Sequence, residues 1–216
     1  MTHSLHRRGT EENLKHDYVL FAMSAKGLNE IGSAGLMRRF LEIVHEYNPV
    51  NLGDMKTGNM FTHSQAELLD NVQDVSIVHA VFTEEDTLIK ALEAVRKADL
   101  GVSVVVSGLI DRVKVMGEQA GAPPHTVECS GGIWGDLKKL ASPEVLEVTT
   151  MCGHGMVAAS MVESLVKKIK RGLISVEEAA LSLATPCVCG IFNPKRAESL
   201  LRKMAFDGSE TAAADD

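Results

Sequence analysis

The sequence predicts an α/β fold: a parallel or mixed sheet of about five strands covered by helices, with a helical C-terminal region. Two observations predict this fold. Short apolar runs alternate along the chain with amphipathic stretches, and glycine, proline and polar residues separate them. The 216 residues are 45% hydrophobic, which is enough to bury a sizeable core in one compact domain. We expect this domain to span residues 17–206, between a polar N-terminal arm (1–16) and an acidic, disordered tail (207–216).

Five segments are typical of strands, because apolar and β-branched residues dominate them. In chain order they are residues 18–23, 75–81, 101–106, 125–129 and 145–150. Helical stretches between these segments favour a parallel or mixed sheet. The stretch 48–62 contains Pro49, Gly53 and Gly58, so we expect it to form a loop.

The predicted helices carry their apolar residues at intervals of three or four positions. They span about 36–47, 83–99, 109–120, 156–170 and 175–184, and a last helix begins at 194. Ser175 and Glu178 have the spacing of a capping box. Asn193-Pro194 is typical of a helix start, with the proline in the first turn.

Charge and hydropathy exclude several classes of function. The net charge of −7 and the lack of a basic stripe argue against binding to nucleic acid or to an anionic membrane. No apolar run approaches the roughly 18–20 residues that span a bilayer. No apolar stretch follows the basic N-terminus, so we expect no signal peptide. We therefore predict a cytoplasmic protein whose four cysteines stay reduced.

The segment from Cys152 to Gly155 is the first candidate site, because it lies at a predicted junction of a strand and a helix. Gly153 and Gly155 let the backbone turn tightly and approach a ligand. The N–H groups at a helix N-terminus stabilise a thiolate, so we expect a lowered pKa for Cys152. His154 could act as its proton partner or as a metal ligand. The same N–H groups could bind a carboxylate or a phosphate.

The sequence Met-Cys-Gly-His-Gly (151–155) is similar to the segment around one catalytic cysteine in the proline racemase family. The resemblance implies a thiol that abstracts or returns the α-proton of a substrate. It covers these five residues and, loosely, the helix up to Glu163. Family members are longer, with two symmetric halves and a distant second cysteine, whereas Cys187 follows here after 35 residues. The resemblance therefore indicates a similar way of activating a thiol, not membership of the family.

The remaining cysteines suggest a metal or cluster site. Cys187 and Cys189 form a Cys-x-Cys pair, whose two sulfurs can bind one metal ion. Together with Cys129 and Cys152 they supply the four thiolates that ligate a [4Fe–4S] cluster. His154 could replace one of them, and a tetrahedral zinc site is the alternative. The spacings match no common ferredoxin or zinc-finger pattern, and Cys129 and Cys187 could equally be packed core residues.

Lys26 and Ser130 complete the candidates for substrate binding, together with Gly153 and Gly155. Lys26 follows the first predicted strand and could hold an anionic group. Ser130 opens a glycine-rich loop that could form a backbone nest for an anion. The basic residues of the N-terminal arm look flexible but could pack on a partner subunit; they are His3, His6, Arg7 and Arg8.

Three hypotheses follow, in order of preference. The first is a metal-dependent enzyme or redox protein, with an iron–sulfur cluster or zinc, that acts on a small anionic metabolite. The second is a metal-free thiol enzyme, racemase-, isomerase- or lyase-like, with Cys152 as base or nucleophile. The third is a non-catalytic accessory subunit with a structural metal site. A homo-oligomer and a complex with a partner subunit are both compatible with the sequence.

Overall fold

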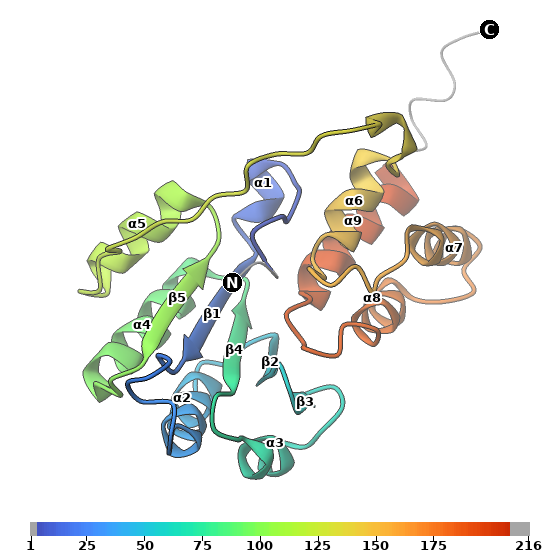
Figure 1. Cartoon of the computed structure of the whole chain (residues 1–216). Helices are drawn as coiled ribbons and strands as arrows, with labels where there is room; N and C mark the ends of the chain where they lie inside the picture. The colour runs from blue at the N-terminus through green and yellow to red at the C-terminus, as the bar shows by residue number, and fades with distance from the viewer. Residues whose placement is uncertain (1–3, 208–216) are drawn as a thin grey trace, which may run out of the picture. The chain divides into compact units, whose positions relative to one another are not determined.

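The computed structural model describes residues 4–207, so His3 and residues 208–216 of the predicted tail lie outside the described residues. The chain divides into two compact units. Unit 1 contains residues 4–9, 129–187 and 194–207, and unit 2 contains residues 10–128 and 188–193. In the colours of Figure 1, most of unit 2 runs from blue to green, and most of unit 1 runs from gold to red.

Unit 2 is built on a five-stranded sheet in which every pair of neighbouring strands is antiparallel (Figure 1). The strand order is β3-β2-β4-β1-β5. The strands are β1 (Tyr18–Met23), β2 (Asn51–Asp54), β3 (Gly58–Asn59), β4 (Ile77–Phe82) and β5 (Ser103–Ser107). The α/β fold and the helical C-terminal region are confirmed, whereas the predicted parallel or mixed sheet is wrong.

Two βαβ connections explain why the sequence suggested parallel strands. β1 leads through α2 (Ala34–His45) to β2, and these strands run in the same direction with β4 between them. β4 leads through α4 (Glu85–Ala98) to β5, with β1 between them. Each crossover therefore skips one antiparallel strand, which is the split βαβ arrangement. The alternation of strands and helices predicts the crossovers. It does not reveal that an antiparallel strand lies between the two parallel strands that each crossover connects.

The main core of unit 2 lies between the sheet and helices α2 and α4 (Figure 1). Alternate residues of each strand face these helices, as the twofold period of side chains requires. Tyr18, Leu20 and Ala22 of β1 are fully buried there, beside Val78 and Ala80 of β4. The remaining helices of unit 2 are α1 (Glu11–Leu14), α3 (Gln65–Asn71) and α5 (Ile110–Gln119).

Strands β2 and β3 lie in the stretch 48–62, which the sequence predicted as a loop. Leu52 is the one large apolar residue of β2, so no apolar pattern marks the strand. Its polar side chains are buried instead: Asn51 is 1% exposed, and its Nδ2 donates to the Gly190 carbonyl at 2.5 Å. A buried amide needs such a partner, and this one lies 139 residues away in the chain.

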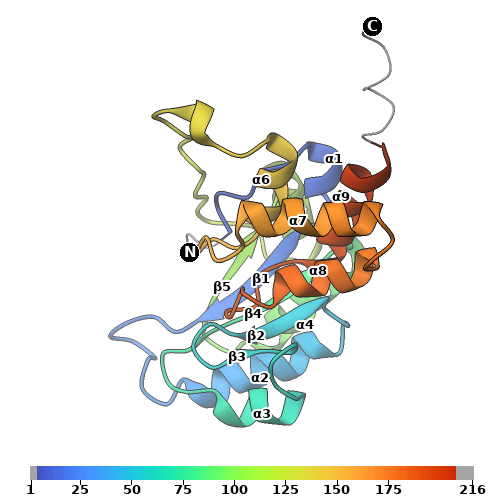
Figure 2. The same cartoon turned by 90° about the vertical axis from the view of Figure 1, so that its right-hand side faces the viewer.

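Unit 1 is helical within its described residues. A short 3-10 turn, η1 (Leu137–Lys139), precedes α6 (Pro143–Thr149), α7 (Ala159–Lys170), α8 (Val176–Ala184) and α9 (Pro194–Phe206). Helix α9 packs against each of α6, α7 and α8 (Figure 2). The predicted apolar stripe of α7 is confirmed, because Val162, Leu165 and Ile169 are buried. The capping box of α8 is also confirmed: Ser175 Oγ accepts from the Glu178 N–H at 3.1 Å.

Two of the five predicted strands are wrong. Residues 125–129 form an exposed segment without regular structure, and most of 145–150 belongs to helix α6. Ser142 caps this helix, since its Oγ accepts from the Val145 N–H at 3.5 Å, and Pro143 occupies the first turn. Val145 and Val148 are buried one helical turn apart, so the apolar residues follow a helical period.

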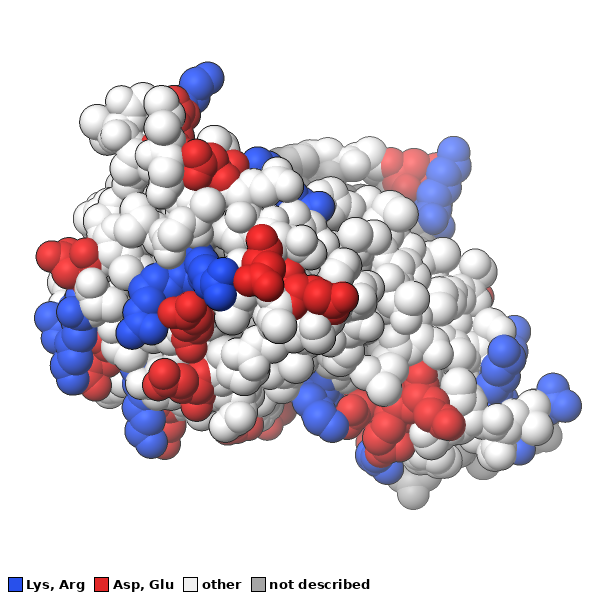
Figure 3. All heavy atoms as spheres, turned by 90° about the horizontal axis from the view of Figure 1, so that it is seen from below, with Lys and Arg blue, Asp and Glu red and all other residues white. Residues whose placement is uncertain are grey.

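Charged side chains of both signs alternate on the face seen from below in Figure 3, and neither sign forms a continuous stripe there. On α2, Arg38 pairs with Asp70 at 2.9 Å, and Arg39 pairs with Glu42 at 3.0 Å. These ion pairs neutralise charge locally on α2, and the expectation that the chain does not bind nucleic acid stays a prediction. Over residues 4–207, no helix is long and apolar enough to cross a membrane.

Candidate thiol site

Cys152 lies in a tight turn between two helices of unit 1, α6 and α7. Its N–H donates to the Thr149 carbonyl at 3.2 Å, and its carbonyl accepts from the Gly155 N–H at 3.0 Å. Gly155 has a φ of +67°, a conformation that favours glycine. The predicted strand-to-helix junction is therefore wrong, because the turn joins two helices and α7 begins at Ala159 instead of Met156.

The thiol of Cys152 is hydrogen-bonded to the thiol of Cys187. Cys187 follows α8, where its N–H donates to the Ala184 carbonyl at 3.0 Å. Both cysteines are buried, with exposed fractions of 2% and 1%. The backbone N–H groups of His154 and Met156 also bond to the Cys152 sulfur. The turn thus surrounds one sulfur of the pair with main-chain donors.

The pKa of the Cys152 thiol is raised, contrary to the lowering that the sequence predicted. Its hydrogen bond to Cys187 is the largest cause, followed by burial and by repulsion from charge on Cys187. The N–H groups of His154 and Met156 act in the opposite direction but are outweighed. Two thiolates in contact repel each other, so the pair can carry one negative charge while it retains one proton.

A pocket of about 420 Å³ opens onto Cys152 within unit 1. Its walls include Thr149 at the end of α6, Gly153 and Gly155 in the turn, and Ala159 at the start of α7. None of the described residues that line the pocket is Asp or Glu. The first N–H groups of α7 carry partial positive charge, so this pocket suits a small anion better than a cation.

Two residues of the N-terminal arm, His6 and Arg8, make fixed contacts beside this pocket, although the sequence suggests a flexible segment. His6 lines the pocket, and its Nδ1 lies 2.9 Å from Ser130 Oγ. Arg8 donates its N–H to Thr150 Oγ1 at 3.0 Å, and the buried Arg196 of α9 donates to the Arg8 carbonyl. The sequence pattern missed His6 because no periodic or spaced motif connects the start of the chain with the thiol turn.

The other predicted site residues differ in their positions relative to the pocket. Gly153 and Gly155 line the pocket, and Ser130 contacts the His6 ring at its wall. His154 gives its N–H to the Cys152 sulfur, while its residue is exposed. Lys26 is exposed in the loop after β1 of unit 2, and its predicted contact with an anion stays a prediction.

Two of the four predicted metal ligands, Cys152 and Cys187, lie together in unit 1. Cys129 is exposed, and Cys189 is buried within unit 2. Among the side chains that the structure describes, no group of three or more His, Cys, Asp or Glu could hold a metal ion. The iron–sulfur cluster and the zinc ion stay predictions, and the sulfur pair is the part of the site that both would share.

The Cys-x-Cys motif has a structural role on the side of Cys189. The side chain of Asn59 donates to the Val188 carbonyl at 2.9 Å, and that of Asn51 donates to the Gly190 carbonyl. Gly190 has a φ of +77°, and a Cβ at this position would overlap the side chain of Asn59. The turn around Cys189 is therefore held by two buried amides of the sheet.

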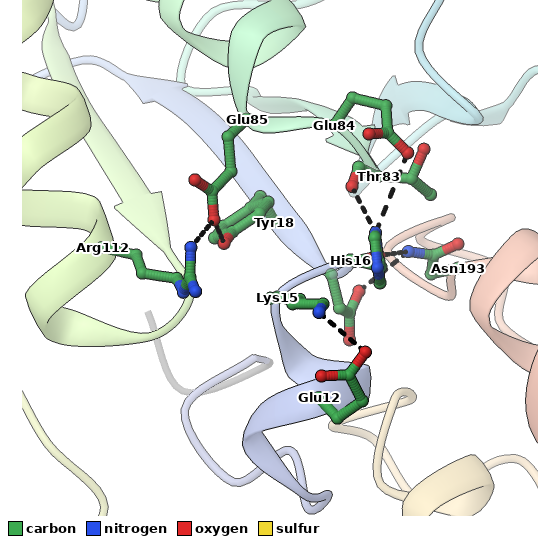
Figure 4. A network of polar contacts seen from close by, with 10 residues as sticks. Glu12, Lys15, His16, Tyr18, Thr83, Glu84, Glu85, Arg112 and Asn193 are labelled. Carbon is green, nitrogen blue, oxygen red and sulfur yellow. Dashed lines mark hydrogen bonds and ion pairs between the residues drawn. The ribbon is translucent and has the colours of Figure 1, made fainter.

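A second polar cluster joins β1 to helices α4 and α5 in unit 2 (Figure 4). Tyr18 donates its hydroxyl to Glu85 Oε1 at 2.6 Å, and Arg112 binds the same oxygen at 2.8 Å. Burial and the bond to Glu85 raise the pKa of Tyr18. Because these three groups satisfy one another, we interpret the cluster as a structural link. Nearby, His16 Nδ1 lies 3.3 Å from the Thr83 carbonyl oxygen.

Comparison of the chain with protein-family models, with curated proteins and with solved structures found no match in any of the three. The similarity to the turn of proline racemases is therefore confined to the residues around Cys152. The sulfur pair and the pocket that Cys152 lines are therefore the features of this chain that indicate a function.

Proposed function

We propose that the protein is a thiol-dependent enzyme that acts on a small anionic metabolite, with Cys152 and Cys187 as the reacting pair. The observation that supports this most strongly is the hydrogen bond between the two thiols, one of which, that of Cys152, lines a pocket. A buried cysteine that serves only as a hydrophobe needs neither a second thiol nor access to a pocket.

The pair offers an acid and a base within one site. With one proton between two sulfurs, the thiolate can accept a proton or attack a substrate, and the remaining thiol can donate a proton. The N–H groups of His154 and Met156 stabilise negative charge on the Cys152 sulfur during such a step. This chemistry fits proton transfer at a carbon next to a carboxylate, as in isomerases and lyases.

The pocket supplies the attraction for an anion. Its described lining has no carboxylate, and the start of α7 and the His6 ring border it. A negatively charged alkylating reagent should therefore be favoured at Cys152 over a neutral reagent of similar size. Iodoacetate and iodoacetamide make this comparison, and the exposed Cys129 in the same molecule serves as the internal standard.

We expect the ratio of the iodoacetate rate to the iodoacetamide rate to be several-fold higher at Cys152 than at Cys129, measured by peptide mass spectrometry. Small carboxylic acids should slow labelling at Cys152 and leave Cys129 unaffected. Equal ratios at the two cysteines, with no protection by any anion, would refute the anion pocket.

Proton transfer is tested directly by exchange in deuterium oxide. The protein is incubated with a panel of small 2-hydroxy and 2-amino acids, and loss of the α-proton signal is followed by NMR. We expect exchange for at least one class of acid, lost in both Cys152→Ser and Cys187→Ser. Cys189→Ser is the matched control and should retain it. Exchange that persists in Cys152→Ser would contradict the assigned role.

A metal-dependent enzyme or an accessory subunit with a structural metal site is the second proposal, because soft metal ions bind paired thiolates. Its support is again the contact of Cys152 and Cys187. Protein purified without oxygen should then carry stoichiometric iron or zinc, with a visible spectrum if a cluster is present. Loss of this metal in Cys152→Ser, but not in Cys129→Ser, would place it at the pair.

A further inference from the structure

We infer that the Cys152–Cys187 pair also performs dithiol–disulfide exchange, reducing small anionic disulfides and closing to an internal disulfide. This inference rests on the proposed thiol site and gives it a further substrate class. The contact of two thiols, one of which lines a pocket, supports the inference. The reaction requires no group beyond the disulfide substrate.

Geometry gives the two cysteines different parts in the exchange. Cys152 lines the pocket and is the sulfur that an incoming disulfide meets. Cys187 is 1% exposed, does not line the pocket and is hydrogen-bonded to Cys152, so an incoming disulfide meets Cys152 first. Cys152 is thus the attacking cysteine and Cys187 the resolving cysteine.

Both cysteines lie outside the helices, where the backbone can adjust as the two sulfurs approach each other. Cys152 sits in the turn with Gly153 and Gly155, and a turn with glycines adjusts more easily than a helix interior. Cys187 lies beyond the end of α8, between Pro186 and Val188, and not within a helix. Formation of the disulfide therefore does not require either helix to unwind.

The exchange balances in two steps. Cys152 first gives its proton to water, and the thiolate so formed attacks one sulfur of the substrate R–S–S–R while Cys187 keeps its own proton. This forms a Cys152–S–S–R mixed disulfide and releases R–S⁻. The Cys187 proton passes to that thiolate, and Cys187 then attacks the Cys152 sulfur and releases the second R–S⁻. The two thiols lose two electrons, which the substrate disulfide gains.

The other cysteines provide the controls. Cys129 is exposed and would react with any disulfide, so Cys129→Ser serves as the reference background. Cys189 is buried in unit 2, and Cys189→Ser in that background is a size-matched control. The Cys187→Ser change removes the resolving sulfur and retains a hydroxyl that can hydrogen-bond.

The probe is dithiobisnitrobenzoate, an anionic aromatic disulfide that releases a coloured thiolate. In native Cys129→Ser protein we expect two equivalents of thiolate, no adduct by intact mass, and a Cys152–Cys187 disulfide in the peptide map. Adding Cys187→Ser should give one equivalent and a stable adduct on Cys152. Adding Cys189→Ser should change nothing.

The outcomes separate the inference from the function on which it rests. A stable adduct on Cys152 in the Cys129→Ser background, with one equivalent released, would overturn the exchange and leave a reactive Cys152. A disulfide that includes Cys189 would also overturn it. Native protein whose Cys152 does not react with the probe at all would overturn both the exchange and the proposed thiol enzyme.

Discussion

The side-chain amide of Asn51 donates a 2.5 Å hydrogen bond to the main-chain carbonyl of Gly190, and so joins β2 to the turn that contains Cys189. The Asn51 amide is buried, and replacement by alanine leaves the carbonyl without this donor. We expect Asn51→Ala to lower the free energy of unfolding by about 2 kcal/mol. Urea denaturation measures this, and Asn71→Ala at an exposed helix end should change it by less than about 0.5 kcal/mol. Equal effects of the two changes would contradict a buried clamp.

Gly190 and Gly27 have the same φ of +77°, which allows steric overlap to be separated from backbone strain. A Cβ at residue 27 meets nothing within 4 Å, whereas one at residue 190 would lie against Asn59 and 3.1 Å from Asn51 Nδ2. Gly27→Ala should cost about 1 kcal/mol for its left-handed backbone. Gly190→Ala should cost about 1–3 kcal/mol more, because the overlap adds to the strain. Thermal unfolding of both variants compares them, and similar midpoints would count against the packing of this turn.

The antiparallel sheet and the Asn51 contact show where sequence reasoning stops. Apolar strands such as β1 and β4 are visible as runs because their side chains are buried by other apolar groups. β2 is held by polar contacts to residues far along the chain, and the local sequence around β2 does not reveal these contacts. The Cys-x-Cys motif predicts a metal site, which stays a prediction, and the sequence does not reveal that asparagines secure the turn around Cys189.

The sequence predicts only part of the candidate site. Cys152 stands out because it directly precedes Gly153-His154-Gly155, in which two glycines flank a histidine. Its partner Cys187 was named as a ligand, but the sequence could not show that the two sulfurs touch. Ser142 and Pro143 are start signals for α6, but the β-branched residues within 145–150 favour a strand. The sequence therefore predicts a strand before Cys152, where the structure has a helix. No feature of the sequence indicates that His6 lines the pocket.

Tyr18 should titrate abnormally, because its hydroxyl is buried and bonded to Glu85. Its pKa in the folded state is raised above 10.0, so the folded protein keeps this proton after an unfolded chain would lose it. Stability from this group is therefore complete below pH 10 and falls as the pH rises further. Ultraviolet titration of the folded protein should show that Tyr18 resists ionisation above pH 10.

Tyr18→Phe gives the matching test. It should lower the free energy of unfolding by about 1 kcal/mol at neutral pH and flatten the loss of stability above pH 10. Tyr47→Phe, the control, should leave that loss in place. Ionisation of Tyr18 near pH 10 in Tyr47→Phe protein that remains folded would disprove the buried Tyr18–Glu85 bond.

The capping box of α8 should contribute to the stability of unit 1. Ser175→Ala removes the acceptor for the Glu178 N–H and should lower the free energy of unfolding by about 1 kcal/mol. Ser182 is half-buried on the same helix, and its hydroxyl only bonds back to the Glu178 carbonyl, so Ser182→Ala should have little effect or stabilise slightly, since alanine is the better helix former. Urea denaturation distinguishes them, and a Ser182 change as costly as Ser175→Ala would argue against the cap.

The Glu178 carboxylate of that box should also respond to pH. Its pKa is lowered, chiefly because the Ser175 N–H and hydroxyl donate to it. The stabilisation is therefore present above the pKa of the unfolded chain and is lost as the pH falls through the folded value. Glu178→Gln should weaken this acid dependence. Identical acid-unfolding curves for the variant and the wild type would show that the carboxylate contributes nothing.

The most direct test of the thiol pair is the pH dependence of iodoacetamide labelling at Cys152, measured in the Cys129→Ser background with and without Cys187→Ala. Contact with Cys187 is the main cause of the raised Cys152 pKa, so removal of Cys187 should shift the midpoint of labelling to lower pH. Labelling at neutral pH should become faster, although one thiol has been removed. Cys189→Ala should leave the midpoint where it is. A midpoint unchanged by Cys187→Ala, or moved to higher pH, would contradict a shared proton between the two sulfurs.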